Sequence, residues 1–235
     1  MTARVADPEP AHSGERTVAR LLLLGGSVLP SFVTVLVVGF FIARQPAEPA
    51  LDGWWHGVMT AVRHPLFDGL SQFLAVWGDS GLGFGVVPAL LVVALVWSGR
   101  ISAVPGFVVT GVVSFVVVQV AQALIDRTGP DILRLSDSGS YPAGHVANVA
   151  NVAALAVFVG LVYRRVWIWA TATGYVLAMA VSRTYLHANW ISDSLAGIIL
   201  GTTIAYAVFV LSTTPAAAAL RERWRVRLIL GSPSR

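Results

Sequence analysis

The chain has 235 residues, of which 56% are hydrophobic and 12% charged. This balance lies outside the usual range of soluble domains and favours a membrane protein. All sixteen basic residues are arginine and there is no cysteine, which excludes disulfides, thiolate nucleophiles and cysteine-bound metals. The arginines follow the ends of apolar runs and do not line one face beside exposed aromatic residues, so we expect no nucleic-acid partner.

Residues 1–20 are polar, and we expect a flexible cytoplasmic tail. The following run, Leu21 to Ala43, is long enough to cross about 30 Å of hydrocarbon and too long for the core of a cleavable signal. Five later runs predict further spans: Leu82 to Trp97, Ile101 to Leu124, Val146 to Tyr163, Val166 to Ser182 and Ile191 to Leu211. The predicted fold is all-α, a polytopic membrane bundle of about six helices over residues 21–212.

The segment 45–81 does not read as a simple span. Apolar residues recur in it at helical spacing, but six aspartate, histidine and arginine residues interrupt them. Its tryptophans favour helices lying at the outer membrane interface. An extra pair of short spans is the competing interpretation.

The arginines predict the orientation of the bundle. With the N-terminus inside, eleven arginines fall on the cytoplasmic side and five outside, so both termini are expected in the cytoplasm. The basic tail, residues 213–235, would then contact anionic lipid of the inner leaflet. The use of arginine alone, with abundant Ala, Val and Gly, favours a bacterial source and hence the cytoplasmic membrane.

Three polar clusters are expected on the outer face: residues 122–130, 141–145 and 182–193. Their order and spacing resemble those of the type 2 phosphatidic acid phosphatase family, which is related to the vanadium haloperoxidases. The family's motifs read Lys-x6-Arg-Pro, Pro-Ser-Gly-His and Ser-Arg-x5-His-x3-Asp. The resemblance implies a helical bundle over roughly residues 20–212, with an outward-facing site for the phosphate of a lipid.

In such enzymes the third-motif histidine attacks phosphorus and an aspartate orients it, while the second-motif histidine protonates the leaving oxygen. Lysine, two arginines and a serine hold the phosphoryl oxygens, as phosphoryl transfer demands. The resemblance implies that His145 and Asp193 are catalytic and that Arg183 and Gly144 bind phosphate.

Four positions depart from the family pattern. Gln122 and Gly129 replace the first-motif lysine and arginine, Ala143 replaces the serine, and Asn189 replaces the nucleophile. Each lost charge-assisted hydrogen bond is worth about 1.5 to 3 kcal/mol. Loss of a nucleophile slows comparable enzymes by up to about a millionfold. We therefore expect an impaired or inactive protein that binds a lipid or lipid-linked phosphate or assists a membrane partner.

Two nearby residues allow a different interpretation. His187 stands two positions before the expected nucleophile, and with support from Asp193 it would make an active phosphatase on a phospholipid, polyprenyl phosphate or diphosphate. An interfacial histidine without such a role is the alternative. Arg127, two positions before the lost arginine, would supply a cation to the phosphate or contact a lipid headgroup.

Structural roles compete at three other positions. His145 would simply begin a helix, and Arg183 and Asp193 would form an ion pair between the fifth and sixth spans. The spacing Gly197-x3-Gly201 predicts a close-packing face, within the bundle or toward a second copy.

We expect no metal and no cofactor, because Asp126 and Asp131, two acids five positions apart in a loop, are a weak signal for metal binding. A channel or transporter is disfavoured, since the spans have no evident repeat symmetry or charge series. The sequence predicts neither the oligomeric state nor a particular partner.

Overall fold

The computed structural model describes residues 24–79, 87–97, 101–130, 139–158 and 166–212, together with isolated positions at 22, 99, 214, 217 and 219. The ordered elements within these ranges are all helical. Two are short turns, a π-helical turn at Leu24–Val28 and a 3-10 turn at Ile101–Ala103. The α-helices are α2 (Leu29–Ala43), α3 (Ala50–Ala61), α4 (Pro65–Asp79), α5 (Val87–Trp97), α6 (Val104–Ile125), α7 (Gly144–Phe158), α8 (Val166–Tyr185) and α9 (Ile191–Ser212).

The prediction of an all-α fold is confirmed, and each of the six apolar runs contains a helix. Within the described ranges, three helices are long and apolar enough to cross a membrane: Leu24–Ala43, Val104–Ile125 and Ile191–Ser212. Pro88–Trp97 and Gly144–Val157 are shorter apolar helices, so six is an approximate count of spans. The predicted N-terminal tail, most of the C-terminal tail and Asp131 lie outside the described residues.

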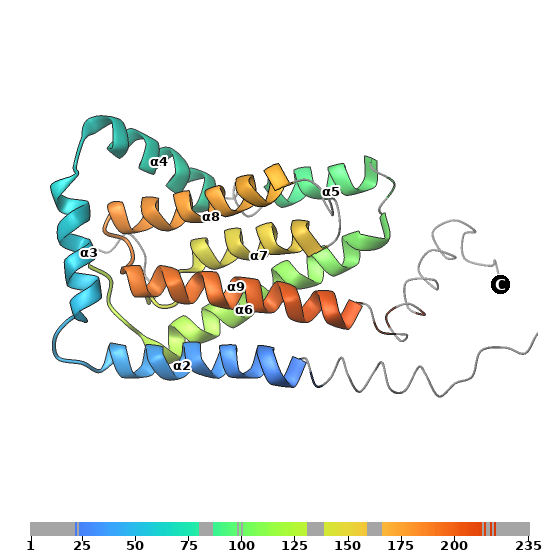
Figure 1. Ribbon diagram of the computed structural model, residues 1–235, viewed down its shortest axis with the longest axis horizontal. Coiled ribbons are helices and arrows are strands. Elements are labelled where there is room, and N and C mark those ends of the chain that lie inside the picture. Colours follow the sequence, from blue (N-terminus) through green and yellow to red (C-terminus); the bar gives the residue numbers. More distant parts are fainter. Residues whose placement is uncertain are drawn as a thin grey trace, which may run out of the picture.

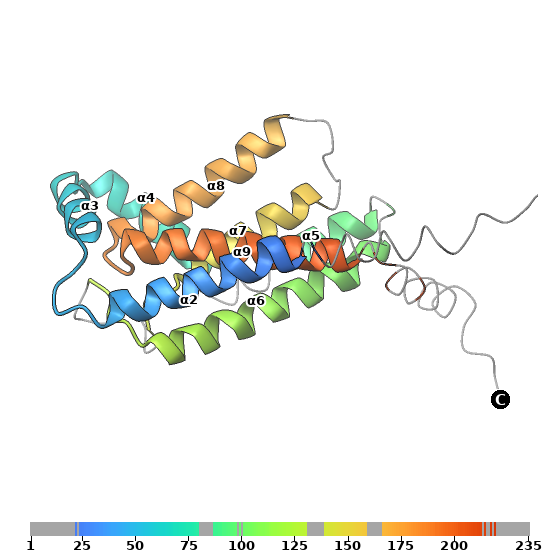
Figure 2. The same cartoon turned by 60° about the horizontal axis from the view of Figure 1, so that its bottom comes forward.

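The long helices run side by side, with α9 in the middle of the group (Figures 1 and 2). Helices α7 and α9 approach at two glycines of α9. A Cβ added to Gly197 would lie 2.6 Å from the carbonyl oxygen of Ala143, and one added to Gly201 would collide with the carbonyl oxygen of Ala147. The glycine spacing therefore serves packing within the bundle, as predicted.

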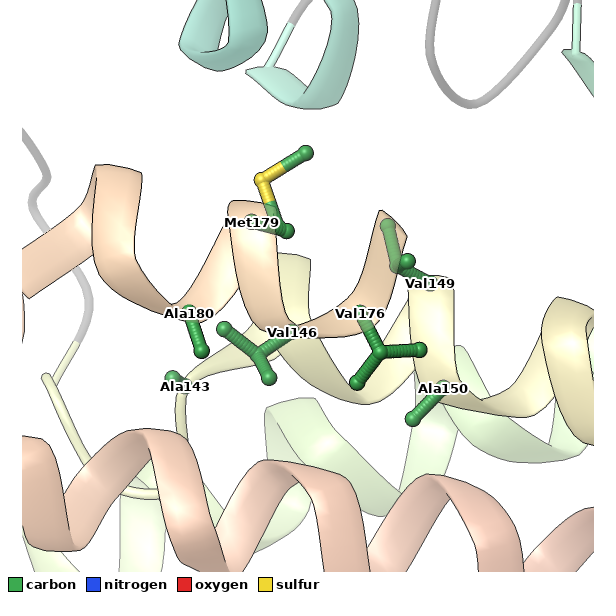
Figure 3. Close-up of a cluster of buried hydrophobic side chains, with 7 residues drawn as sticks. All are labelled: Ala143, Val146, Val149, Ala150, Val176, Met179 and Ala180. Carbon is green, nitrogen blue, oxygen red and sulfur yellow. The ribbon is translucent and has the colours of Figure 1, made fainter. Parts of the chain in front are cut away.

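Buried side chains, most of them small or branched, line α7 and α8 where the two helices pack together. One cluster, drawn in Figure 3, consists of Ala143, Val146, Val149, Ala150, Val176, Met179 and Ala180. Large apolar side chains elsewhere face outward, including Phe41, Trp97 and Leu124, which are 66%, 89% and 66% exposed. An apolar surface of this kind suits contact with lipid tails and would be a liability in water.

The segment predicted to lie at the interface forms α3 and α4, of 12 and 15 residues. These are shorter than the roughly 20 residues that a helical span needs, which argues against an extra pair of spans. Helix α3 lies across the end of the bundle, and α4 turns back toward α8 (Figure 1). Both helices cover the end where the three polar motifs meet.

Candidate functional site

Backbone and amide hydrogen bonds join the three motifs at one end of the bundle. The side chain of Gln122 donates to the carbonyl oxygen of Pro142 at 3.0 Å, linking the first motif to the second. The amide of Ala143 donates to the carbonyl oxygen of Asp193, also at 3.0 Å, linking the second motif to the third. The convergence expected from the motifs is present in the structure.

The end of α6 directs the first motif into the site. Asp126 closes the helix with left-handed backbone angles (φ 47°, ψ 48°), and its amide donates to the carbonyl oxygen of Gln122. A single residue in this conformation ends a helix and turns the chain away from the helix axis. Arg127, the next residue, then lies inside the site with only 6% of its surface exposed.

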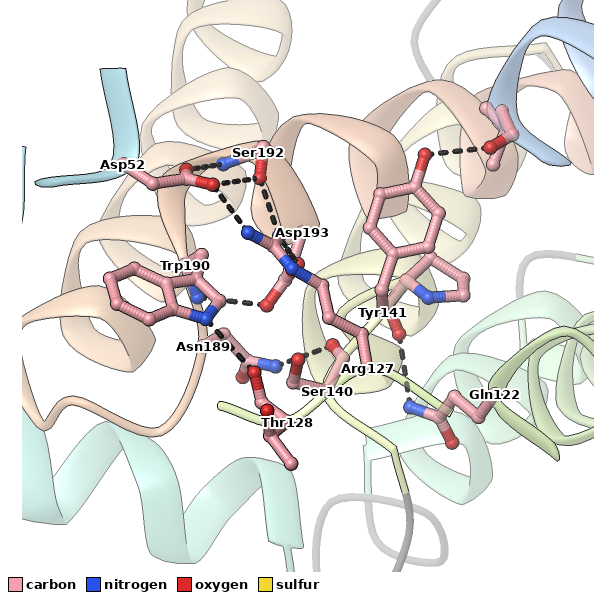
Figure 4. A network of polar contacts seen from close by, with 12 residues as sticks. Asp52, Gln122, Arg127, Thr128, Ser140, Tyr141, Asn189, Trp190, Ser192 and Asp193 are labelled. Atoms are coloured by element: carbon pink, nitrogen blue, oxygen red, sulfur yellow. Dashed lines mark hydrogen bonds and ion pairs between the residues drawn. The ribbon is translucent and has the colours of Figure 1, made fainter. Parts of the chain in front are cut away.

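Arg127 is the centre of a buried polar network (Figure 4). Its Nη2 donates to Oδ2 of Asp52 at 2.6 Å, and its Nη1 donates to Oγ of Ser192 at 2.7 Å and to Oδ1 of Asp193. Both carboxylate side chains are 0% exposed. One guanidinium thus pairs with two acids from helices that lie far apart in the sequence.

Asp52, on α3, is a site residue that the sequence analysis missed. Besides the bond from Arg127, its carboxylate accepts one from the backbone N–H of Ser192 at 2.9 Å and one from the Ser192 hydroxyl at 2.7 Å. In the sequence it reads as one of several polar interruptions of an apolar segment. Nothing local marks it as buried, since its partners lie 75 and 140 positions away.

Asn189, which the motif spacing predicts to stand at the nucleophile position, is buried, and both the oxygen and the nitrogen of its amide form hydrogen bonds. Its Oδ1 accepts a hydrogen bond from Nε of Arg183 at 3.2 Å, and its Nδ2 donates to the carbonyl oxygen of Ser140 at 2.8 Å. The side chain is therefore a link between the second and third motifs.

Asp193 pairs with Arg127, whereas the sequence pattern suggested an ion pair with Arg183. Its Oδ2 accepts a hydrogen bond from the backbone N–H of Trp190 at 2.8 Å. The Trp190 indole in turn donates to the carbonyl oxygen of Thr128 at 3.0 Å, and the Arg127 guanidinium lies 5.6 Å from the ring centroid. These contacts hold the loop before α9 against the first motif.

Gly129, at the position of the lost arginine, abuts the third motif. A Cβ at this position would lie 3.0 Å from the carbonyl oxygen of Ala188. Ala143, at the serine position, is fully buried. Neither position has open space for the larger side chain of the family motif.

His187 lies against α3. Its backbone is left-handed (φ 56°), its ring centroid is 4.2 Å from that of His56, and its Nε2 is 3.3 Å from Oγ1 of Thr60. His145 is half-buried in the first turn of α7, beside Gly144. The two histidines predicted to be catalytic therefore lie on different elements, and His187 faces the helix that covers the site.

Helices α3 and α4 hold the third motif through polar contacts. The Trp55 indole donates to Oγ1 of Thr184 at 2.9 Å, and the Ser182 hydroxyl donates to the carbonyl oxygen of Ser71 at 2.9 Å. The Tyr185 hydroxyl donates to Oδ1 of Asp68, and this bond, with one from Arg63, lowers the pKa of the Asp68 carboxyl. Among the described residues, no group of three or more His, Asp or Glu side chains is placed to hold a metal ion.

Comparisons with known proteins agree with the fold. Residues 112–215 match the model of the PAP2 superfamily, so the resemblance inferred from the motifs is confirmed. The structure resembles a transmembrane PAP2 type phosphatidylglycerolphosphate phosphatase from Bacillus subtilis, with a TM-score of 0.65 and 20% identity over 77% of this chain and 94% of that one. It also resembles Aquifex aeolicus LpxE, with a TM-score of 0.56 and 21% identity over 68% and 96% of the two chains. No curated protein sequence matches the chain.

Proposed function

We propose that this protein, which has the fold of the membrane PAP2-type lipid phosphatases, binds a lipid or lipid-linked phosphate without hydrolysing it. Asn189 carries the proposal. A carboxamide cannot accept a phosphoryl group as the imidazole of the family does. The Asn189 amide is also buried, and both its oxygen and its nitrogen are engaged by Arg183 and Ser140.

The other substituted positions support the same conclusion. The Gln122 amide donates a hydrogen bond to the carbonyl oxygen of Pro142 in the second motif. Gly129 lies against the backbone of the third motif. Asp193, which in the family orients the nucleophile, is paired with Arg127. Asn189, Gln122 and Asp193 thus each link two segments of this chain.

Features suited to an anionic headgroup remain. Arg183 keeps its motif position beside Asn189, and His145 is half-buried in the first turn of α7. Helices α7 and α9 both begin at the site, where the bond from Ala143 to Asp193 joins them. The positive ends of two helix dipoles at one point favour an anion. The arginine distribution supports an outward-facing site in the cytoplasmic membrane.

An active phosphatase that uses His187 is the less favoured function. The His187 ring packs at a tilt against His56 of α3, and the aspartate that would support His187, Asp193, is paired with Arg127. To act as the nucleophile, His187 would have to leave His56 and gain a contact with Asp193.

The test is phosphate release and lipid binding by the purified protein in detergent. Substrates are phosphatidic acid, phosphatidylglycerol phosphate and polyprenyl phosphates and diphosphates, with diacylglycerol as the unphosphorylated comparison. We expect no phosphate release by the wild type, and preferential retention of phosphorylated lipids in native mass spectrometry. Release that disappears in His187→Ala would establish the active phosphatase instead.

A matched pair of variants tests where the headgroup binds. Arg183→Gln should lower retention of phosphorylated lipid, whereas Arg44→Gln, the same change at an exposed arginine stacked on Phe40, should not. Equal retention by both variants would place the headgroup elsewhere. Equal retention of phosphorylated and unphosphorylated lipid by the wild type would refute phosphate binding itself.

A further inference from the structure

The carboxylate of Asp52 occupies an anion site made by Arg127 and the first turn of α9. We propose that α3 is a latch, in which Asp52 competes with the phosphate monoester of a lipid for Arg127 and Ser192. The lipid would bind there when α3 moves away. This inference rests on the proposed function and assigns a means of regulation to the same site.

The donors around Asp52 are those that bind phosphate monoesters in proteins. They comprise a guanidinium N–H, a backbone N–H in the first turn of a helix and a hydroxyl, with distances of 2.6, 2.9 and 2.7 Å to the Asp52 oxygens. A phosphate monoester has three terminal oxygens and more negative charge than a carboxylate. It can therefore accept every bond that Asp52 accepts and interact more strongly with Arg127.

The cation of this site is not the family's. The family's first-motif arginine position holds Gly129, which lies against the backbone at Ala188. Arg127 brings a guanidinium to the end of the bundle from two positions earlier, where Asp193 also holds it. The structure thus keeps a buried cation at the end of the first motif, and an internal carboxylate covers it.

The position of Asp52 sets the net charge around Arg127 and therefore whether a further anion can bind there. With α3 in place, Asp52, Arg127 and Asp193 together carry one positive and two negative formal charges, which disfavours a further anion. Withdrawal of Asp52 leaves a neutral pair of Arg127 and Asp193 with donors free for a phosphate. Asp52 is therefore both a competitor and a source of repulsion.

The contacts of α3 suit a helix that can leave the site. Beyond Asp52, its contacts include the Trp55 indole on Thr184, the tilted packing of the His56 ring against His187, and Thr60 Oγ1, which lies 3.3 Å from Nε2 of His187. Water and lipid headgroups can replace hydrogen bonds of this kind. Trp54, on the same helix, is 61% exposed. Non-helical residues at 44–49 and 62–64 flank the helix and allow it to move as a unit.

The first measurement is the affinity of the detergent-solubilised protein for dihexanoyl phosphatidic acid, obtained by isothermal titration calorimetry. Asp52→Asn keeps the shape of the side chain and removes its charge, and we expect it to bind about tenfold more tightly than the wild type. The control is Glu48→Gln, which makes the same charge change at an exposed residue just before α3. It should bind within about twofold of the wild type, because its effect is screened by solvent.

The second measurement follows α3 without a ligand. The chain contains no cysteine, so Gly57→Cys and Leu195→Cys provide unique sites for spin labels. A side chain at Gly57 meets open space, and Leu195 is 45% exposed on α9. We expect Asp52→Asn to lengthen or broaden the distance distribution between the labels, and dihexanoyl phosphatidic acid to do the same in the protein with Asp52 intact.

The two readouts separate the latch from the proposed function. Equal affinity of wild type and Asp52→Asn, with unchanged label distances, would overturn the latch and leave lipid-phosphate binding standing. Movement of α3 in Asp52→Asn without any binding would show that Asp52 holds α3 in place, but it would refute both the competition with a lipid phosphate and the proposed function. No movement and no binding would overturn both.

Discussion

Nη2 of Arg127 lies 2.6 Å from Oδ2 of Asp52 and joins the end of α6 to α3 across 75 positions of the chain. The same guanidinium holds Asp193, in the first turn of α9. One cation therefore joins α3, α9 and the end of α6 where the three motifs meet. The contact that closes the site in this way also stabilises the bundle.

Removal of Arg127 should be costly. Arg127→Met would leave two carboxylates buried without a cation, and we expect the free energy of unfolding to fall by about 3 to 5 kcal/mol. The measurement is thermal or denaturant unfolding in detergent, followed by circular dichroism. Arg63→Met is the control, because its pair with Asp68 is 41% and 37% exposed and should contribute at most about 1 kcal/mol. Equal losses for both variants would contradict the buried role of Arg127.

Gly201 is expected to tolerate no side chain. Gly201→Ala would press a methyl group into the carbonyl group of Ala147 and force α7 and α9 apart, lowering the free energy of unfolding by about 1 to 3 kcal/mol. Gly174→Ala, in α8 with no atom within 4 Å of the added Cβ, should be neutral or stabilising by up to about 1 kcal/mol. The measurement is the free energy of unfolding of the two variants in the same detergent. A Gly201→Ala protein as stable as the wild type would disprove the close approach of α7 and α9.

An arginine at residue 129, the first-motif arginine position, should destabilise the protein. Gly129→Arg brings a Cβ within 3.0 Å of the carbonyl oxygen of Ala188, so we expect it to displace the third motif and destabilise the fold by about 1 to 3 kcal/mol. Thr128→Arg adds the same charge one position earlier, at an exposed side chain, and should fold normally. The monodisperse fraction after size-exclusion chromatography and the unfolding temperature measure both. A fully stable Gly129→Arg protein would mean that the loop accommodates the arginine.

Tyr141 should titrate at unusually high pH. Burial raises the pKa of its phenol to about 12, with a further contribution from the charge of Asp193, and its hydroxyl donates to the carbonyl oxygen of Val35 at 2.7 Å. Because the folded pKa exceeds the ordinary value of 10, the stabilisation is complete below pH 10 and is lost as the pH rises toward 12. Ultraviolet difference titration of wild type against Tyr141→Phe isolates this group. A transition near pH 10 at this residue would contradict its burial.

Much of the architecture could be predicted from the sequence, because it depends on local patterns. Apolar runs of sufficient length predict helices where the structure has them, and Gly197-x3-Gly201 predicts a close approach of helices that the structure contains. The three motifs were enough to predict which loops converge. These inferences need only the spacing of residue types along the chain.

The roles within the site could not be predicted in the same way. Arg183 was a reasonable partner for Asp193 because both belong to one motif, yet Arg127 pairs with it. Asp52 looked like an interruption of an apolar segment, although it is 1% exposed and accepts three hydrogen bonds. A charge on an amphipathic helix can face water or the protein, and the local sequence does not distinguish the two.

The sequence by itself determined the class of fold and the convergence of three motifs, and it predicts that Asn189 stands at the position of the family's nucleophile, since each follows from residue identity and spacing. Only the tertiary structure decided that the Asn189 amide links two motifs and that Asp52 covers Arg127. The physical reason is the distance along the chain over which each interaction acts. Hydropathy and helix periodicity act over neighbouring residues, whereas a buried ion pair forms only when separate helices bring opposite charges within about 3 Å and exclude water from them.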